Sequence, residues 1–186
     1  HNLMDKVIYN PRFSLLYRLN TYTQFRASWA SGFRAPQAFD ADMHIAFAGG
    51  GVSRIRLADD LKAERSNSYS ASVNFDKATE KYIWGFTAEG FYTVLNQAFM
   101  LEEAGSDEFG TIYEKRNANG SVVKGVTLEL RSNFRRKIQV EAGYTLQSSY
   151  YQKPVAYSVS LDAIRKYLRT PDAYGYYTLT ITPGDN

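Results

Sequence analysis

Apolar and polar residues alternate along much of this chain, and the clearest stretch runs from Ile138 to Tyr151. Every second residue, beginning with Ile138 and Val140, is mostly apolar, whereas the residues between them are mostly polar. Alternate side chains of a β-strand point to opposite faces, so this stretch predicts a strand with one apolar and one polar face. At ~3.3 Å per residue it would be about 45 Å long, far beyond the usual strand of about five or six residues. A long two-faced strand that is rich in Tyr toward one end is typical of the wall of a membrane-spanning β-barrel.

The same period of two recurs elsewhere, and each recurrence predicts a strand. The predicted strands are Arg12–Leu19, Tyr22–Ser31, Ser66–Phe75, Tyr82–Leu95, Ser121–Arg131 and Tyr174–Ile181, with Thr111–Lys115 as a shorter one. Asn119-Gly120, between the short strand and the next, predicts a type I′ hairpin turn. One helical pattern occurs late in the chain: Ser160 is a candidate N-cap, and Leu161, Ile164, Tyr167 and Leu168 share one face of a predicted short helix.

Short and long connections alternate between these strands. The short turns lie at Asn20-Thr21, Asp76–Lys81 and Ser132–Lys137, and the long loops are Arg34–Asp60, Met100–Asn119 and Gln152–Arg169. Outer-membrane barrels have short periplasmic turns at one end and long extracellular loops at the other. The pattern therefore predicts an all-β fold of seven or eight antiparallel up-and-down strands, a partial arc of a large transmembrane β-barrel with long extracellular loops. A closed barrel suits a membrane because every backbone polar group finds a partner within the sheet.

The aromatic content strengthens this interpretation. The chain has 15 Tyr, 11 Phe and 2 Trp, and such rings gather at both interfaces of membrane barrels. Long uncharged runs such as Gly90–Leu101 and Ala142–Gln152 are still shorter than the ~20 apolar residues of a membrane helix. We therefore expect any crossing of a bilayer to be made by strands.

Charge and terminal sequence exclude other classes. The net charge is +3, but the longest basic run, Arg135-Arg136-Lys137, lies in a predicted turn, so there is no clustered basic face for nucleic acid. The absence of cysteine excludes disulfides. The first residues lack the basic and apolar regions of a signal peptide, and we expect the sequence to be a piece of a longer chain.

Three sequence landmarks carry a family resemblance. Arg26–Pro36 resembles a strand that ends in Gly-Phe-Arg-Ala-Pro, and Leu61–Tyr69 resembles the Leu-x-Pro-Glu-x-Ser motif that opens the next strand, with Ala63 where Pro is usual. Gly125–Glu129 resembles a Gly-x-Glu strand. The order and spacing of these landmarks resemble the barrel of TonB-dependent receptors, and in detail look most like receptors of the Bacteroides group.

The resemblance implies a large, roughly 22-strand barrel that encloses a plug domain. Residues 1–186 would form a partial β-barrel domain without the plug domain and the last strands. Such receptors actively take up iron chelates, haem, cobalamin or glycans, with energy from the TonB complex of the inner membrane. The implied partners are outer-membrane lipid, the receptor's own N-terminal plug domain, the TonB complex through the plug, and a small-molecule nutrient. The implied location is the bacterial outer membrane, and no enzymatic activity, cofactor or nucleic acid is expected.

Candidate ligand-binding residues lie in the first long loop: Arg34, Asp40, Asp42, Met43 and His44. His and Met are haem ligands, so the last four are candidates for binding haem or a metal chelate, although a solvated polar loop is the simpler explanation. Arg34 either contacts ligand or anchors the loop to the barrel rim, and the anchor is our preferred interpretation. The charged inward residues predict a solvated wall that faces plug or water, not an acid–base pair: Arg26, Glu89, Glu129, Arg131 and Glu141. The chain shows no Ser/His/Asp set and no metal-ligand spacing.

Two other interpretations stay open at the level of sequence. A structural or adhesive outer-membrane barrel would share the strand pattern but would have no plug domain and TonB box upstream. A soluble lipid-binding β protein would turn its apolar face into a closed cavity. Coordinates in which Trp84, Leu128 and Tyr144 meet in a sealed interior would favour the soluble protein.

Overall fold

A computed structural model of the chain describes residues 7–36, 54–107, 110–155, 164–167 and 170–182. All regular structure within these ranges is β-strand. The strands are β1 (Arg12–Arg18), β2 (Thr23–Arg34), β3 (Arg54–Leu57), β4 (Glu64–Ala78), β5 (Tyr82–Asn96), β6 (Phe99–Asp107), β7 (Gly110–Asn117), β8 (Ser121–Phe134), β9 (Ile138–Val155), β10 (Ile164–Lys166) and β11 (Ala173–Ile181).

In the described part of the chain, no helix is long and apolar enough to cross a membrane.

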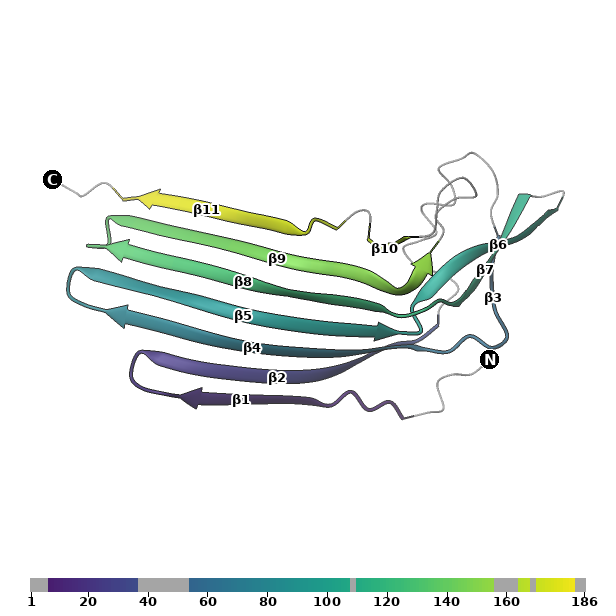
Figure 1. The fold of residues 1–186 in the computed structure, drawn as a ribbon, viewed down its shortest axis with the longest axis horizontal. Coiled ribbons are helices and arrows are strands. Elements are labelled where there is room, and N and C mark those ends of the chain that lie inside the picture. The colour runs from purple at the N-terminus through teal and green to yellow at the C-terminus, as the bar shows by residue number, and fades with distance from the viewer. Residues whose placement is uncertain (1–6, 37–53, 108–109, 156–163, 168–169, 183–186) are drawn as a thin grey trace.

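Eight of the strands form one antiparallel sheet. Its order is β1-β2-β4-β5-β8-β9, and both β10 and β11 pair with the free edge of β9 (Figure 1). The turns that join β1 to β2, β4 to β5 and β8 to β9 lie together at one end of the sheet, as Figure 1 shows. The predicted all-β, up-and-down arrangement of seven or eight strands is therefore confirmed, and β9 is four residues longer at its C-terminal end than the 138–151 stretch predicted.

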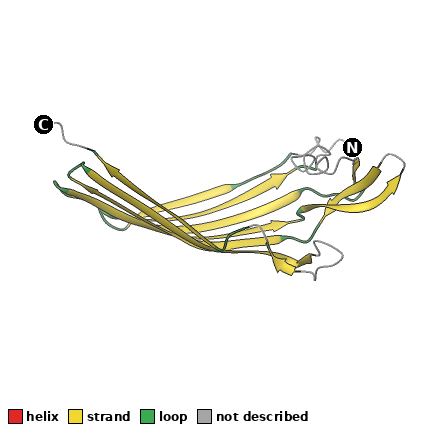
Figure 2. Ribbon diagram, turned by 90° about the horizontal axis from the view of Figure 1, so that it is seen from above, coloured by secondary structure: helices red, strands yellow, loops and turns green. Residues whose placement is uncertain are grey.

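The two faces of the sheet differ as the alternation predicts. On β8, Leu128 and Leu130 are 53% and 63% exposed, whereas their polar neighbours Thr127 and Glu129 are partly covered. The sheet is curved (Figure 2). Side chains on the concave side of a curved sheet crowd one another, so we assign the less exposed polar side chains to that side. We call these the inner, polar face and the outer, apolar face. Trp84 and Tyr144 are half exposed on the outer face, so the described residues form no sealed apolar interior.

The short turns close by local hydrogen bonds. The Oδ1 atom of Asn20 accepts the backbone N–H groups of Tyr22 and Thr23, both at 2.9 Å, which fixes the first turn. In the third turn Arg135 and Arg136 have φ values of 51° and 59°, and the N–H of Lys137 donates to the carbonyl of Phe134 at 2.9 Å. Two consecutive residues with positive φ are the signature of a type I′ turn, which matches the twist of the flanking strands.

A second, three-stranded sheet in the order β3-β7-β6 extends beyond the other end of the main sheet (Figure 1). It occupies parts of the first two predicted long loops, and β3 and β6 were not predicted. Strand β7 pairs in parallel with β3 and antiparallel with β6. Because β8 pairs instead with β5 and β9, the predicted hairpin at Asn119-Gly120 is wrong. Neither residue has a positive φ, and they link the two sheets rather than two paired strands.

The predicted helix in the last long loop is also wrong over the part of it that the structure describes, residues 164–167. Residues Ile164–Lys166 form strand β10, which pairs with β9 through Ile164 and Lys166 with an irregular register. The extended edge of the long strand β9 offers backbone partners that a single isolated helical turn could not match. Ser160, Leu161 and Leu168 lie outside the described residues.

Candidate ligand-facing site

The sheet β3-β7-β6 is held against the ends of β2 and β4 by a buried carboxylate. Glu64, the first residue of β4, is 7% exposed. Its Oε1 atom accepts the backbone N–H of Phe99 at 2.5 Å, and its Oε2 atom lies 3.3 Å from Nη1 of Arg34. The first residue of β6 is thereby tied to the last residue of β2 through one side chain. We call Arg34, Glu64 and Phe99 the rim cluster.

The ring of Phe99 also lies beside two cations. The guanidinium of Arg34 is 5.6 Å and the ammonium of Lys115 is 5.0 Å from its centroid, both within the range of a cation–π interaction. Lys115 is 2% exposed and lies in the middle strand β7 of the small sheet. The contacts that join the small sheet to the rim therefore include both ring packing and charged groups.

Asn117 supplies a second tie. Its Oδ1 atom accepts the N–H of Lys62 at 2.6 Å, and its Nδ2 atom donates to the carbonyls of Lys62 and Gln97 at 2.7 and 2.8 Å. One amide thus joins the end of β7 to the segments before β4 and after β5. Gln97 has a φ of 56°, which turns the chain sharply from β5 into β6.

One face of the small sheet carries a charged network. Glu114 on β7 contacts Nε of Arg56 at 3.0 Å and Nη2 of Arg116 at 2.5 Å, and Nη1 of Arg116 lies 3.0 Å from Glu102. The pKa of Arg116 is raised above its ordinary value, first by the hydrogen bond to Glu114 and then by the charges of the two carboxylates. This face offers both acceptors and donors to a polar ligand.

Of the predicted ligand-binding residues, Arg34 is the one that the structure describes. It takes part in the rim cluster, and its side chain is half exposed. Asp40, Asp42, Met43 and His44 lie outside the described residues, so their role stays a prediction. Sequence reasoning did not single out Glu64, Phe99 or Asn117. Glu64 is the glutamate of the Leu61–Tyr69 landmark, so that motif was the available signal.

The inner face of the main sheet is a wall of paired polar groups. Hydrogen bonds join Ser28 to Ser70 at 2.8 Å and Thr127 to Thr145 at 3.0 Å. Other predicted wall residues also have local partners: Gln139 donates to Glu141 at 2.6 Å, and the hydroxyl of Tyr176 lies 3.4 Å from Glu129. Arg26 and Glu89 line a shallow hollow of about 380 Å³ between β2, β4 and β5.

Arg131 links three strands by hydrogen bonds near the short turns of the main sheet. Its Nε and Nη2 atoms donate to the two carboxylate oxygens of Asp76 at 2.9 and 3.0 Å, and Nη1 donates to Thr87 at 3.0 Å. This fork spans β8, β5 and β4. Asp76, Glu129 and Glu141 on this face therefore each have a hydrogen-bond partner.

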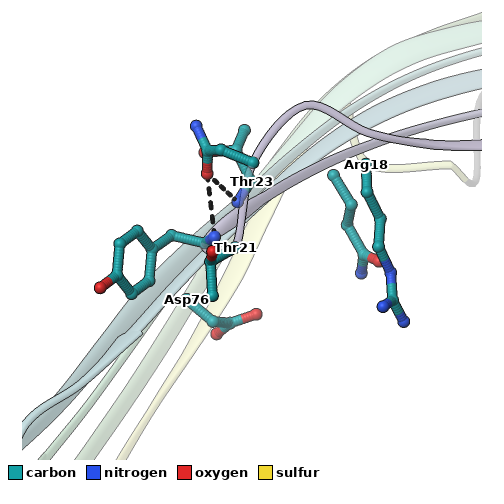
Figure 3. A pocket seen from close by; sticks show the side chains of 7 residues that line it. Arg18, Thr21, Thr23 and Asp76 are labelled. Atoms are coloured by element: carbon teal, nitrogen blue, oxygen red, sulfur yellow. Dashed lines mark hydrogen bonds between the residues drawn. The ribbon is translucent and has the colours of Figure 1, made fainter.

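A further pocket of about 530 Å³ lies at the short-turn end, opposite the rim cluster. Figure 3 shows Arg18, Thr21, Thr23 and Asp76 around it, with the hydrogen bonds of the Asn20 amide oxygen drawn as dashes. In the described ranges, no group of three or more His, Cys, Asp and Glu residues is arranged to hold a metal ion.

Long antiparallel strands with an apolar outer face, a polar inner face and an elaborate rim at one end define a segment of a large β-barrel. The chain matches the family described as TonB dependent receptor-like, beta-barrel, over residues 4–183, and it belongs to that family. Members of this family are transporters, not enzymes, and their homologous barrels are outer-membrane proteins of Gram-negative bacteria. In general they work with a plug domain, TonB and a small-molecule ligand.

Two solved structures share the fold. The FrpB iron transporter from Neisseria meningitidis (F3-3 variant) matches with a TM-score of 0.56 at 20% identity, over 76% of this chain and 19% of that one. The siderophore receptor PirA from Pseudomonas aeruginosa matches with a TM-score of 0.50 at 17% identity, over 92% of this chain and 41% of that one. The chain therefore spans less than half of either protein. No curated protein matches it.

Proposed function

We propose that this chain is a wall segment of an outer-membrane receptor that takes up a small nutrient with energy from TonB. The observation that carries the proposal is the separation of the two faces of the sheet. Outer residues such as Leu128 are more than half exposed and apolar, whereas inner residues such as Thr127 and Thr145 bond to one another. Hydrocarbon on one side and water or a plug on the other account for both faces.

In this proposal residues 1–186 form one partial barrel domain. Its polar face looks toward the receptor's own plug domain, which in turn contacts the TonB complex. Residues 34–60, 100–119 and 152–169 face the ligand outside the cell, and the rim cluster holds the small sheet at that entrance. Arg34 anchors the rim, and Asp40, Asp42, Met43 and His44 are candidates for ligand contact.

An iron chelate is the favoured ligand, because FrpB is an iron transporter and PirA is a siderophore receptor. Haem, cobalamin and glycans are the other nutrients that the resemblance implies. A kinship with receptors of the Bacteroides group is supported by the sequence landmarks alone.

The orientation of the faces is tested by cysteine labelling of the receptor that contains this chain. The chain has no native cysteine, and the neighbouring residues Ala88 and Glu89 point to the outer and inner faces. In outer-membrane vesicles, Glu89→Cys should react with a charged, water-soluble maleimide. Ala88→Cys should react only with a lipid-soluble one. The reverse pattern, or equal reaction of both with the charged reagent, would refute the proposal.

Transport is tested by uptake of ⁵⁵Fe-loaded chelates into cells with and without the receptor gene. We expect uptake that requires both the receptor and TonB. Correct face labelling without TonB-dependent uptake of any tested nutrient would favour a structural or adhesive barrel instead.

A further inference from the structure

The outer face of the main sheet has a trough where its side chains are smallest. The strand register places Ala27, Ala71 and Gly90 side by side on β2, β4 and β5. This hollow is open to the outside and is lined mainly by apolar groups, among them Val126. A Cβ atom added at Gly90 would meet no heavy atom within 4 Å, so the described residues leave this space open.

Aromatic rings and one cation border the trough on the side of the rim cluster. Tyr69, Tyr92 and Lys124 form the next cross-strand row, and the two tyrosine rings have centroids 6.5 Å apart. The ammonium of Lys124 lies 5.7 Å from the centroid of the Tyr150 ring. Lys124 is exposed, and among the described residues it has no carboxylate partner.

This lysine stands out on the outer face. Consider the outer-face residues of the six strands β1, β2, β4, β5, β8 and β9 that lie between two cross-strand rows, the row that contains Asn67 near the rim and the row that contains Lys77 near the short turns. Among these residues, Lys124 is the one with a charged side chain. A cation beside an open apolar trough suits an occupant with an anionic head and an apolar body. An uncharged hydrocarbon chain would leave the ammonium without a counter-charge.

The height of Lys124 on the wall agrees with such an occupant. Lys77 and Ser132 share the row of Trp84, and Ser132 lies eight residues after Lys124 on β8. At ~3.3 Å per residue and a tilt of about 40°, the two rows are separated by roughly 20 Å along the membrane normal. An apolar band of a barrel is about 25 Å tall, so Lys124 lies at one edge of the band, at the level of lipid headgroups.

We propose that the trough holds an acyl chain of a phosphorylated lipid of the outer leaflet, whose headgroup phosphate contacts Lys124. The tyrosine rings would lie at the boundary between headgroup and hydrocarbon, where amphipathic rings are favoured. This inference rests on the proposed function, because it requires the apolar face to look onto the bilayer.

The charge is tested by native mass spectrometry of the purified receptor that contains this chain. Lipid A is titrated as the anionic probe, and phosphatidylcholine as the probe without net charge. Lys124→Gln should weaken lipid A binding about fivefold, the effect of ~1 kcal/mol for one basic residue at an anionic surface. The matched control is Lys77→Gln, because Lys77 also lies over a tyrosine ring, at 5.8 Å from Tyr22, but at the other edge of the band. Neither substitution should alter phosphatidylcholine binding.

The trough is tested by Gly90→Leu, whose side chain would occupy part of it and whose Cβ atom would meet no heavy atom within 4 Å. Displacing about two methylenes of the acyl chain, at ~0.8 kcal/mol each, predicts lipid A binding weakened about fifteenfold. Val140→Leu, on the outer face of β9 away from the trough, should leave lipid A binding unchanged. Equal losses for Lys124→Gln and Lys77→Gln, or full retention of lipid A by Gly90→Leu, would overturn the inference. If the cysteine pattern at residues 88 and 89 is reversed, the proposed function itself fails; if that pattern holds and lipid A binding is unchanged, only this inference fails.

Discussion

Removing the carboxylate of Glu64 should release the small sheet from the rim. In Glu64→Ala the N–H of Phe99 loses an acceptor at 2.5 Å, and Arg34 loses the carboxylate oxygen that lies 3.3 Å from its Nη1 atom. A hydrogen bond to a charged group contributes about 1.5–3 kcal/mol. The ion pair adds at most about 1 kcal/mol, because Arg34 is half exposed and water screens it. We therefore expect local opening at Phe99 to become easier by about 2 kcal/mol, which corresponds to roughly 30-fold faster amide exchange.

The assay is hydrogen–deuterium exchange of the receptor, read at peptides that contain Phe99 and at peptides from β8. Glu64→Gln keeps an acceptor for Phe99 and should accelerate exchange only about fivefold, since it loses mainly the charge, worth ~1 kcal/mol. Glu103→Ala is the matched control, because Glu103 is an exposed carboxylate on the same strand β6. Exchange at β8 should not change in any variant. Unchanged exchange at Phe99 in Glu64→Ala would refute the role assigned to the rim cluster.

Three further pairs of substitutions test how the main sheet is held together. Gly125→Val should lower the free energy of unfolding, measured by thermal unfolding, by about 1–3 kcal/mol, because the new Cβ would lie 2.4 Å from the carbonyl oxygen of Leu146. Gly90→Val is the control: its Cβ would meet no heavy atom within 4 Å, so the free energy of unfolding should not change. Arg135→Gly should raise the free energy of unfolding by about 0.5 kcal/mol: glycine adopts a φ of 51° without strain, and this gain exceeds the cost of the extra freedom of the unfolded chain. Arg135→Val should lower it, because a β-branched side chain disfavours that φ. The opposite order of the two variants would contradict this account. Arg131→Met should cost no more than about 1 kcal/mol because Arg131 and Asp76 are both well exposed, and a double-mutant cycle with Asp76→Asn should recover a coupling of about 0.5 kcal/mol; a coupling of zero would show that the fork is not a stabilising contact.

The strands of the main sheet were predictable because the pattern that specifies each strand lies within its own residues. A period of two marks each strand, and a residue such as Asn20, which bonds to its own backbone, marks a turn. The turn at Arg135 and Arg136 was predicted from its position between two alternating stretches, although its backbone conformation was not. A tight connection between long strands tolerates even two arginines with positive φ when the register on both sides fixes the turn.

The small sheet was not predictable in the same way. Strand β3 pairs with β7 across more than fifty residues of chain. Its four residues, Arg-Ile-Arg-Leu, do alternate, but the stretch is too short to be recognised as a strand, and β6 shows no alternation of apolar and polar residues. The Asn119-Gly120 signal was misleading because both strands beside it found other partners. A turn motif predicts a hairpin only when the flanking strands have no better partner elsewhere.

Sequence by itself determined that this chain forms long, two-faced strands joined alternately by short turns and long loops. Alternate side chains of a strand point to opposite faces, so the order of residues within each strand is enough to specify its two faces. Only the tertiary structure decided that β7 joins β3 and β6 in a second sheet, that a buried carboxylate fixes this sheet at the rim, and that three small residues on different strands leave an open trough beside a lysine. These features depend on strand register and on contacts between residues distant along the chain, which no local pattern encodes.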